Sequence, residues 1–447
     1  APMKHGRPPK ASDGSGGAIA VFFDYNSEIW AQRIGANGDL LWGSTGIRIT
    51  ETEPLGYIKV ASDGFGGFVV AFKEYGYDKV YAQRVDKMGN LIWDDNPDFG
   101  IEITDYGYPF DIVADGFGGL FLVFTRSLEE RSLNTRVQRV YPNGYIWDIV
   151  ITGGGLPVGT GIEPVVAENT TDGVIVAWKE YNYAWDVFAI GVSASADTLW
   201  GPVCVCFTGD EKDNIAIMPD GLGGAYLAWE DYRGDGYPSI YAQRLDYMGT
   251  PLWEENGLLV GHDIETQISP AIIESGEGCV IAWTDYRMDE YLAGQKLGPD
   301  GTVAWSAGGA FLAQGYYDQN YDITPDRAGG LFVSFIKDND TTGYDVYAQS
   351  RDYRNSIPQP HPVISQVTDV PADQGGFVRL TVGASEYDVF GEQLVHIARY
   401  DVWQRVEGEL YETPSTLNED TIVENEEGRF LLTAPAGAVP SGPWEFV

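Results

Sequence analysis

The stretch "DGFGGFVVAFKEYGYDKVYAQRVDKMGNLIW" occupies residues 63–93, and a close copy, "DGLGGAYLAWEDYRGDGYPSIYAQRLDYMGTPLW", occupies residues 220–253. Each copy opens on an Asp-Gly turn, continues as a short apolar run and ends on a tryptophan. The glycines supply backbone angles that a Cβ resists, so the chain can reverse tightly between two strands. Self-similarity of this kind is typical of a repeat architecture.

The repeat runs through most of the chain. Middle runs such as "FVVAF" (68–72) and "AYLAW" (225–229) are apolar at every position, as in strands covered on both faces, whereas "KVYAQRV" (79–85) alternates more. Successive turns lie 48 to 57 residues apart, and a tryptophan closes six of the seven units. Seven all-strand units of this length predict an all-β fold, a seven-bladed β-propeller with four-stranded blades. The turn or its remnant occurs at Asp13, Asp63, Asp115, Asp172, Asp220, Gly276 and Asp326.

The pattern resembles repeat proteins of secreted bacterial type, whose blades read roughly D-G-x-G-G-x-x-x-A-W-x-D-x-R followed by Y-A-Q-R-L-D-x-x-G-x-x-L-W. Residues 220–253 match it nearly throughout, whereas "NTRVQRV" (134–140) and "VFAIGVS" (187–193) depart from it. The resemblance implies a propeller over residues 1–355 and a secreted or cell-surface location. Blade seven runs out after "DVYAQSRD" (345–352), so we expect its closing strand from residues 1–10, with residues 361–367 as the alternative.

The repeat disappears in the last part of the chain. A proline-rich linker, "SIPQPHP", covers residues 356–362. Residues 363–447 then resemble the opening strands of a fibronectin type III-like β-sandwich, in which Val382 takes the usual place of a core tryptophan and Trp403 is a substitute. A complete sandwich takes about 100 residues, so we expect this domain to be incomplete in the chain.

Composition excludes several classes of partner. The formal charge is −38, from 66 acidic and 28 basic residues, and such a surface repels nucleic acids and anionic lipid. No apolar run reaches the roughly 20 residues that a membrane helix needs, so no membrane insertion is expected. Three cysteines cannot build a disulfide framework. We expect buried free thiols, with Cys204 and Cys206 on the same face of one strand.

Catalytic signatures are missing from the sequence. Four scattered histidines form no H-E-x-x-H, and there is no G-x-S-x-G, P-loop or C-x-x-C motif. The Gly-rich turns open strands rather than helices, so no helix N-terminus would meet a phosphate. We therefore predict no catalytic residues and a protein that is not an enzyme.

The better functional signal is positional. In a four-stranded blade, the loops between strands two and three and between one blade and the next lie on one rim, opposite the Asp-Gly turns. Those loops are dense in tyrosine and carboxylate, and aromatic rings can stack on sugars or hold cations. A scaffold rim without a small ligand is the alternative interpretation, since repetition alone would copy these residues. The candidate ligand-binding residues are Tyr75, Tyr77, Tyr106, Tyr108, Tyr181, Tyr183, Trp185, Tyr232, Tyr237, Tyr286, Tyr316 and Tyr317.

One loop is a candidate calcium site. "DNDTTG" (338–343) partly matches the start of an EF-hand loop, but its twelfth position is Gln349 instead of a bidentate glutamate. Asp338, Asp340 and Asp345 are the candidate Ca²⁺ ligands, with a solvated turn as the alternative.

These patterns favour a non-catalytic binding or scaffold protein that presents its rim to a glycan or a protein partner, including other copies of itself. The first alternative is a structural subunit of an extracellular filament or surface layer, joined by strand pairing. The second is a glycan-active hydrolase or lyase, which would need uncopied carboxylates that converge near the inner strands.

Overall fold

The structure is a computed structural model, and the chain divides into two compact units, Ala1–Asn355 and Ser356–Val447. Every regular element among the described residues is a β-strand. No helix in that part of the chain is long and apolar enough to cross a membrane. The structure describes residues 10–24, 28–50, 54–74, 79–93, 99–105, 107–127, 133–147, 154–170, 173–234, 236–262, 265–287, 291–313, 321–326, 329–339, 343–351, 363–369, 378–383, 421–425, 428–432 and 444–446.

The first unit contains seven antiparallel sheets that follow one another along the chain. Blades one to four are β1 (Lys10–Ser12), β2 (Ala18–Phe23), β3 (Ile29–Ile34), β4 (Ile47–Arg48); β5 (Pro54–Ser62), β6 (Phe68–Glu74), β7 (Val80–Val85), β8 (Ile101–Thr104); β9 (Phe110–Ala114), β10 (Leu120–Ser127), β11 (Leu133–Val140), β12 (Leu156–Gly159); and β13 (Ile162–Asn169), β14 (Gly173–Tyr181), β15 (Trp185–Ser193), β16 (Thr198–Cys206). Blades five to seven are β17 (Lys212–Pro219), β18 (Ala225–Asp231), β19 (Ser239–Leu245), β20 (Leu258–Leu259); β21 (Gln267–Ser275), β22 (Gly278–Asp285), β23 (Tyr291–Leu297), β24 (Ala310–Ala313); and β25 (Tyr321–Pro325), β26 (Leu331–Asn339), β27 (Gly343–Arg351).

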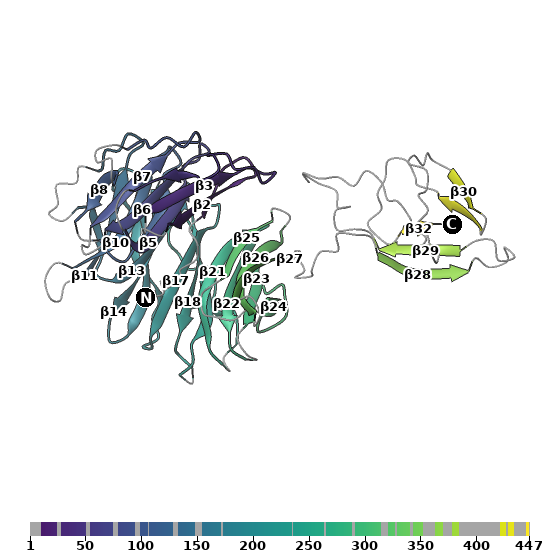
Figure 1. The fold of residues 1–447 in the computed structure, drawn as a ribbon. Helices are drawn as coiled ribbons and strands as arrows, with labels where there is room; N and C mark the ends of the chain where they lie inside the picture. The colour runs from purple at the N-terminus through teal and green to yellow at the C-terminus, as the bar shows by residue number, and fades with distance from the viewer. Residues whose placement is uncertain are drawn as a thin grey trace. The chain divides into compact units, whose positions relative to one another are not determined.

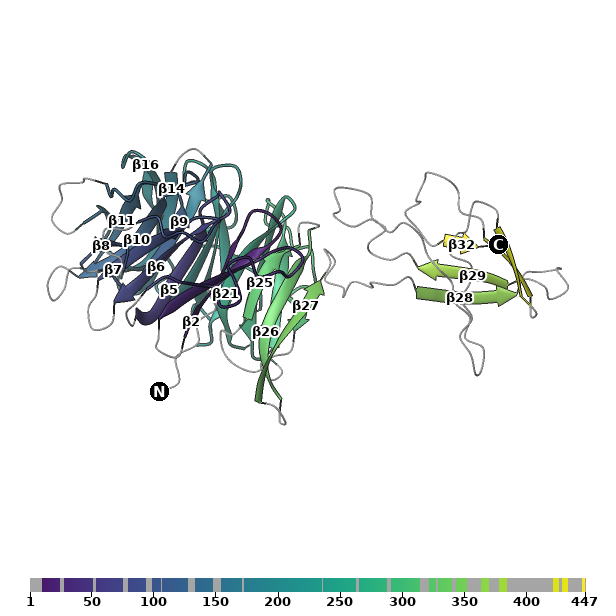
Figure 2. The same ribbon diagram turned by 45° about the horizontal axis from the view of Figure 1, so that its top comes forward.

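These sheets surround an axis, which confirms the predicted seven-bladed β-propeller. Figure 1 shows the blades in order, from purple at blade one to green at blade seven. Figure 2 shows the same succession of blades in a view tilted by 45°. The inner strands of neighbouring blades are in contact, for instance β13 with β9 and with β17.

The hydrophobic core lies between the blades. The second strands of blades two to six are buried on both faces: every residue of 68–72, 120–124, 174–178, 225–229 and 280–283 is at most 2% exposed. One core cluster joins Val69 and Ala71 of blade two to Leu120 and Leu122 of blade three, and the same kind of packing recurs between later blades. The continuous apolar runs are thus explained by burial between two neighbouring sheets.

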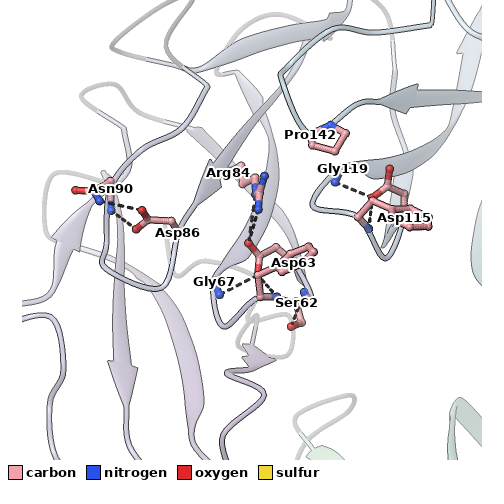
Figure 3. Close-up of polar contacts among 12 residues, drawn as sticks. Ser62, Asp63, Gly67, Arg84, Asp86, Asn90, Asp115, Gly119 and Pro142 are labelled. Carbon is pink, nitrogen blue, oxygen red and sulfur yellow. Dashed lines mark hydrogen bonds and ion pairs between the residues drawn. The ribbon is translucent and has the colours of Figure 1, made fainter.

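The Asp-Gly turns are held by their aspartates (Figure 3). Oδ1 of Asp63 accepts hydrogen bonds from the backbone N–H groups of Phe65 and Gly67, both at 2.8 Å. Its Oδ2 lies 3.0 Å from Nη2 of Arg84, the arginine of the Y-A-Q-R strand. The same ion pair recurs as Asp13–Arg33, Asp115–Arg139 and Asp220–Arg244. The repeated Asp and Arg therefore stabilise the fold together.

The repeated glutamine and tryptophan serve a similar purpose. Gln83 accepts a hydrogen bond from the backbone N–H of Trp93 at 2.9 Å and donates one to its carbonyl at 2.7 Å. The indole N–H of Trp93 donates to the carbonyl of Pro142 in the next blade at 3.1 Å. Each closing tryptophan of this kind ties one blade to its successor, as Trp42 and Trp253 also do.

Blade seven has three strands among the described residues. Residues 363–367 belong to β28 (Val363–Asp369), which pairs with β29 (Val378–Gly383) in the second unit, so the alternative closing strand is wrong. Of the preferred candidate, residues 1–10, only Lys10 is described, and it pairs with Ala20 inside blade one. Residues 1–9 lie outside the described residues.

The second unit is also built from strands where it is described. β28, β29 and β32 (Trp444–Phe446) form one sheet, and β30 (Thr421–Asn425) pairs with β31 (Gly428–Leu432). Val382 stands opposite Trp444 in the first sheet. Trp403 and the linker 356–362 lie outside the described residues.

The prediction for the cysteines is wrong in one respect. All three are free, and Cys206 and Cys279 are buried, but Cys204 is exposed. Val187 pairs with Cys206 while the adjacent Phe188 pairs with Cys204, which marks a β-bulge. A bulge adds one residue to a strand and breaks the simple alternation of its faces.

Candidate functional site

The site emerges where the repeat changes from blade to blade. At the end of each second strand, an aromatic residue is followed by one position that varies and by a second that is usually charged. The varying position is occupied in turn by Phe23, Lys73, Thr125, Lys179, Glu230, Thr284 and Ile336. These residues precede the loops of the rim opposite the Asp-Gly turns, so this rim carries chemistry that differs between blades.

The second, repeated position is structural. Asp285 is fully buried and accepts hydrogen bonds from the indole of Trp283 at 3.0 Å and from Nε of Arg287 at 3.1 Å. In blade five, Asp231 accepts in the same way from Trp229 and Arg233. Burial alone would raise the pKa of Asp285, but the hydrogen bonds from its arginine and tryptophan outweigh it and lower the pKa. Both carboxylates therefore bind the protein's own tryptophan and arginine side chains.

The varying position of blade four carries a buried lysine between two carboxylates. Nζ of Lys179 lies 2.8 Å from Oε2 of Glu163 and 2.7 Å from Oδ1 of Asp213. The lysine side chain is 9% exposed, whereas the two acids are 45% and 40% exposed. Burial acts to lower the pKa of Lys179, but the hydrogen bonds to both acids raise it overall. Glu163 is the second residue of β13 in blade four and Asp213 the second residue of β17 in blade five, so the ammonium bridges two blades where their inner strands begin.

The varying position of blade five is a buried carboxylate. Glu230 is 2% exposed and stands directly opposite Asp213 in the β17–β18 pair, so two like charges share one face of the sheet. Its Oε1 accepts hydrogen bonds from the backbone N–H of Ser269 and from Nδ2 of Asn214, both at 2.7 Å. Burial raises the pKa of Glu230, and the charge of Asp213 raises it further. Like charges opposite each other destabilise a sheet, which makes the pair a candidate functional feature.

The backbone beside these residues is strained. Glu163, Asn214 and Ser269 occupy equivalent places in β13, β17 and β21 and have φ angles of 52°, 47° and 58°. Each lies in a β-bulge near the start of its inner strand. Residues with a Cβ rarely adopt such angles, and strain of this type concentrates at functional sites. The Ser269 hydroxyl is also buried without a hydrogen-bond partner among the described residues. Together, Glu163, Lys179, Asp213, Asn214, Glu230 and Ser269 are called the hub cluster below.

Three of the predicted aromatic residues lie beside the hub cluster. The ring centroid of Trp185 is 5.5 Å from Nζ of Lys179, and Tyr181 meets the same indole edge-on at 5.4 Å. The Tyr232 hydroxyl lies 3.5 Å from Oε2 of Glu230, and burial together with that carboxylate raises the pKa of Tyr232 to about 12. Tyr183, in the loop between β14 and β15, is 94% exposed.

The structure places the other predicted residues elsewhere. Tyr108 packs against Tyr57, with ring centroids 5.0 Å apart, and Nζ of Lys73 lies 4.4 Å from its ring centroid. Tyr237 is 52% exposed, and Tyr286 donates its backbone N–H to the carbonyl of Thr266. Tyr75, Tyr77, Tyr106, Tyr316 and Tyr317 lie outside the described residues.

The candidate calcium ligands lie in the β26–β27 hairpin. Asp338 stands opposite Tyr344, and Asp345 stands opposite Lys337. Asp340 lies outside the described residues. Within the part of the chain that the structure describes, no three His, Cys, Asp or Glu side chains gather to hold a metal ion.

The sequence interpretation named no residue of the hub cluster as a site residue. It concentrated on tyrosine-rich loops, which the repeat copies, whereas the hub cluster occupies positions where the residue changes between blades. The usable signal was the varying position in "AFKE", "VFTR", "AWKE" and "AWED", where lysine, threonine and glutamate alternate in an otherwise regular pattern.

Comparison with known proteins bears on the fold. No protein-family model matches the sequence, and no curated protein matches it. Polysaccharide lyase Uly1 superposes with a TM-score of 0.50 at 9% identity, over 79% of this chain and 91% of that one. An ulvan lyase of family PL25 gives a TM-score of 0.49 at 11% identity, over 78% and 94%. A puromycin hydrolase gives 0.45 at 15% identity over 85% of this chain, which spans 58% of that enzyme. Two of these three structures are polysaccharide lyases.

Proposed function

We propose that the protein is a carbohydrate-binding propeller that holds a sugar at the hub cluster. The observation that carries this proposal is the set of uncopied, half-exposed carboxylates, Glu163 and Asp213, fixed by Lys179 beside the Trp185 indole. The fold by itself does not select a function, because propellers host many.

The chemistry of the hub cluster suits a sugar. An indole offers an apolar face to the C–H groups of a pyranose ring, while carboxylate oxygens accept hydrogen bonds from hydroxyl groups. Lys179 holds Glu163 and Asp213 in place, so less side-chain freedom is lost when a ligand binds. The buried Ser269 hydroxyl, which lacks a partner among the described residues, adds a donor and an acceptor.

The wider setting that we propose is extracellular. Residues 363–447 form a fibronectin type III-like domain that links a secreted propeller to its surroundings, and the rim presents the ligand site as a non-catalytic scaffold. Assembly into a filament or surface layer through strand pairing is the alternative setting. A strictly monomeric species in light scattering at high concentration would argue against the filament.

A glycan-active enzyme is the second candidate function, and the Asp213–Glu230 pair favours it. Glycosidases commonly use two carboxyl groups, one kept protonated by its surroundings as an acid and one ionised. The buried Glu230, with its raised pKa, suits the first role, and the more exposed Asp213 suits the second. Turnover of a polysaccharide panel that disappears in Glu230→Gln would support an enzyme, whereas binding without turnover supports a binding protein.

Isothermal titration with a panel of oligosaccharides tests the binding function. We expect at least one neutral or charged oligosaccharide to bind the wild type, with Trp185→Ala and Asp213→Asn each weakening it tenfold or more. Tyr247→Ala is the matched control, because Tyr247 is 65% exposed in the β19–β20 hairpin, on the rim of the Asp-Gly turns. Equal loss in the control, or binding unaffected by the two hub variants, would refute the proposal.

A further inference from the structure

We infer that the glycan held at the hub cluster is cationic: a polymer of amino sugars whose amino groups are free rather than acetylated. This inference rests on the proposed function and names its ligand class. It follows from the balance of charge at the hub cluster, from the way the protein's own ammonium is bound there, and from the described cations of blades four to six, which already bind the protein's own groups.

The hub cluster has more negative than positive charge. Glu163 and Asp213 share the single ammonium of Lys179, which leaves one net negative charge on the three side chains. Glu211, exposed beside the start of β17, adds another carboxylate near Tyr232. The chain as a whole has a formal net charge of −38, and a negative electrostatic field concentrates cations near the protein surface.

Lys179 shows how an ammonium group is bound in this place. Its Nζ contacts one carboxylate oxygen from each of two blades and lies 5.5 Å from the centroid of the Trp185 ring. A carboxylate has two oxygens and about four lone-pair sites, and both acids are 40% exposed or more. A second ammonium, from a ligand, can therefore use the remaining acceptors and the aromatic face of Trp185 or Tyr181.

In blades four to six, which carry the hub cluster, an anionic sugar finds no comparable partner among the described residues of this rim. The ammonium groups of Lys73, over the Tyr108 ring, and Lys79, 2.7 Å from Glu102, belong to blade two. Arg233 and Arg287 are bound to Asp231 and Asp285, and Arg126 lies 3.6 Å from Asp105. Lys179, the ammonium of the hub cluster, is already shared by two acids. A uronate carboxylate would thus meet repulsion from Glu163 and Asp213, and the guanidinium groups that could offset it already serve the protein's own carboxylates.

Titration of four ligands tests the inference. The probes are a fully deacetylated glucosamine hexamer, its N-acetylated counterpart, an oligogalacturonate of the same length and a hexalysine peptide. We expect the deacetylated hexamer to bind at least tenfold more tightly than the acetylated one, with an affinity that falls as salt rises. Glu163→Gln and Asp213→Asn are near-isosteric changes in two different blades, and each should remove that preference. Trp185→Ala should weaken the binding of both hexamers.

The outcomes separate this inference from the proposed function. Equal or tighter binding of the acetylated hexamer, or binding of the oligogalacturonate alone, overturns the cationic ligand but leaves a sugar site at the hub cluster. Binding of hexalysine without any sugar overturns both and points to a basic protein partner. Binding of none of the four probes also counts against both. A preference that persists in Glu163→Gln and Asp213→Asn contradicts the assignment to the hub cluster.

Discussion

Replacing Glu230 with glutamine should leave the propeller as stable as the wild type, or more stable, at pH 7. The new side chain would keep an amide oxygen in the place of Oε1, so the N–H of Ser269 and the amide of Asn214, both now at 2.7 Å, keep their acceptor. The new NH2 group takes the place of Oε2, where it can donate to the Tyr232 hydroxyl oxygen, which now lies 3.5 Å from Oε2. The two donors to Oε1 are thus not stranded; a stranded buried donor would cost about 1–3 kcal/mol. The change removes a negative charge directly opposite Asp213. Relief of a like-charge cross-strand pair is worth up to about 1 kcal/mol.

The difference in stability between the wild type and Glu230→Gln should depend on pH. Burial raises the pKa of Glu230 above its ordinary 4.5, so the folded state holds this proton more tightly than the unfolded state. The wild type then loses stability as pH rises from 4.5 through the folded pKa, whereas the glutamine variant does not. We therefore expect the advantage of Glu230→Gln to vanish below about pH 4.5, where the wild-type glutamate is protonated in both states.

Urea unfolding at pH 7 and at pH 4 measures both points. Glu230→Ala is the contrasting variant: it leaves the donors of Ser269 and Asn214 without an acceptor and should cost about 2–4 kcal/mol. If Glu230→Gln loses more than about 1 kcal/mol at pH 7, Glu230 contributes to stability as an ionised group, and the reasoning that sets this carboxylate aside for a ligand fails. Stability sacrificed at one residue is expected at a functional site and not in a scaffold.

Three further predictions concern the structural residues. Asp285→Ala should cost about 3–5 kcal/mol in urea unfolding, because Trp283 and Arg287 lose their buried acceptor; a loss below about 1 kcal/mol would contradict this. The pKa of Asp285 is lowered from 3.8, so its stabilisation is complete above pH 3.8 and is lost as pH falls through the folded pKa. When unfolding is followed by tryptophan fluorescence, the free energy of unfolding should fall less steeply with decreasing pH in Asp285→Ala than in the wild type. An equal dependence on pH in the two proteins would count against this role of Asp285. Gly249→Ala should lower the melting temperature, since Gly249 has φ +78° and a Cβ there would lie 2.3 Å from Trp200; an unaltered midpoint would argue against that packing.

Much of the fold could be predicted from the sequence, because its determinants are local and repeated. The turn glycines beside Asp63 and the unbroken apolar runs report backbone angles and two-sided burial, and both depend on a few consecutive residues. What the pattern could not show was the pairing of the motif's own charges, such as Asp63 with Arg84. That ion pair explains why the turn aspartate and the strand arginine recur together.

The hub cluster could not be predicted for a physical reason. Lys179 meets Glu163 within its own blade and Asp213 from the next one, across 16 and 34 residues of sequence. Those meetings depend on β-bulges near the starts of β13 and β17, and bulges change the face of a residue without a clear sequence signature. The misplacement of Cys204 has the same cause.

A crystal structure of the protein soaked with a glucosamine oligosaccharide tests the central claim most directly. We expect a sugar ring against the Trp185 indole, with its amino group within hydrogen-bonding distance of Glu163 or Asp213 and with Lys179 still between the two acids. A sugar bound instead among the Asp-Gly turns, beside exposed residues such as Phe65 and Tyr247, or a hub cluster that contains only water at saturating ligand, would contradict it.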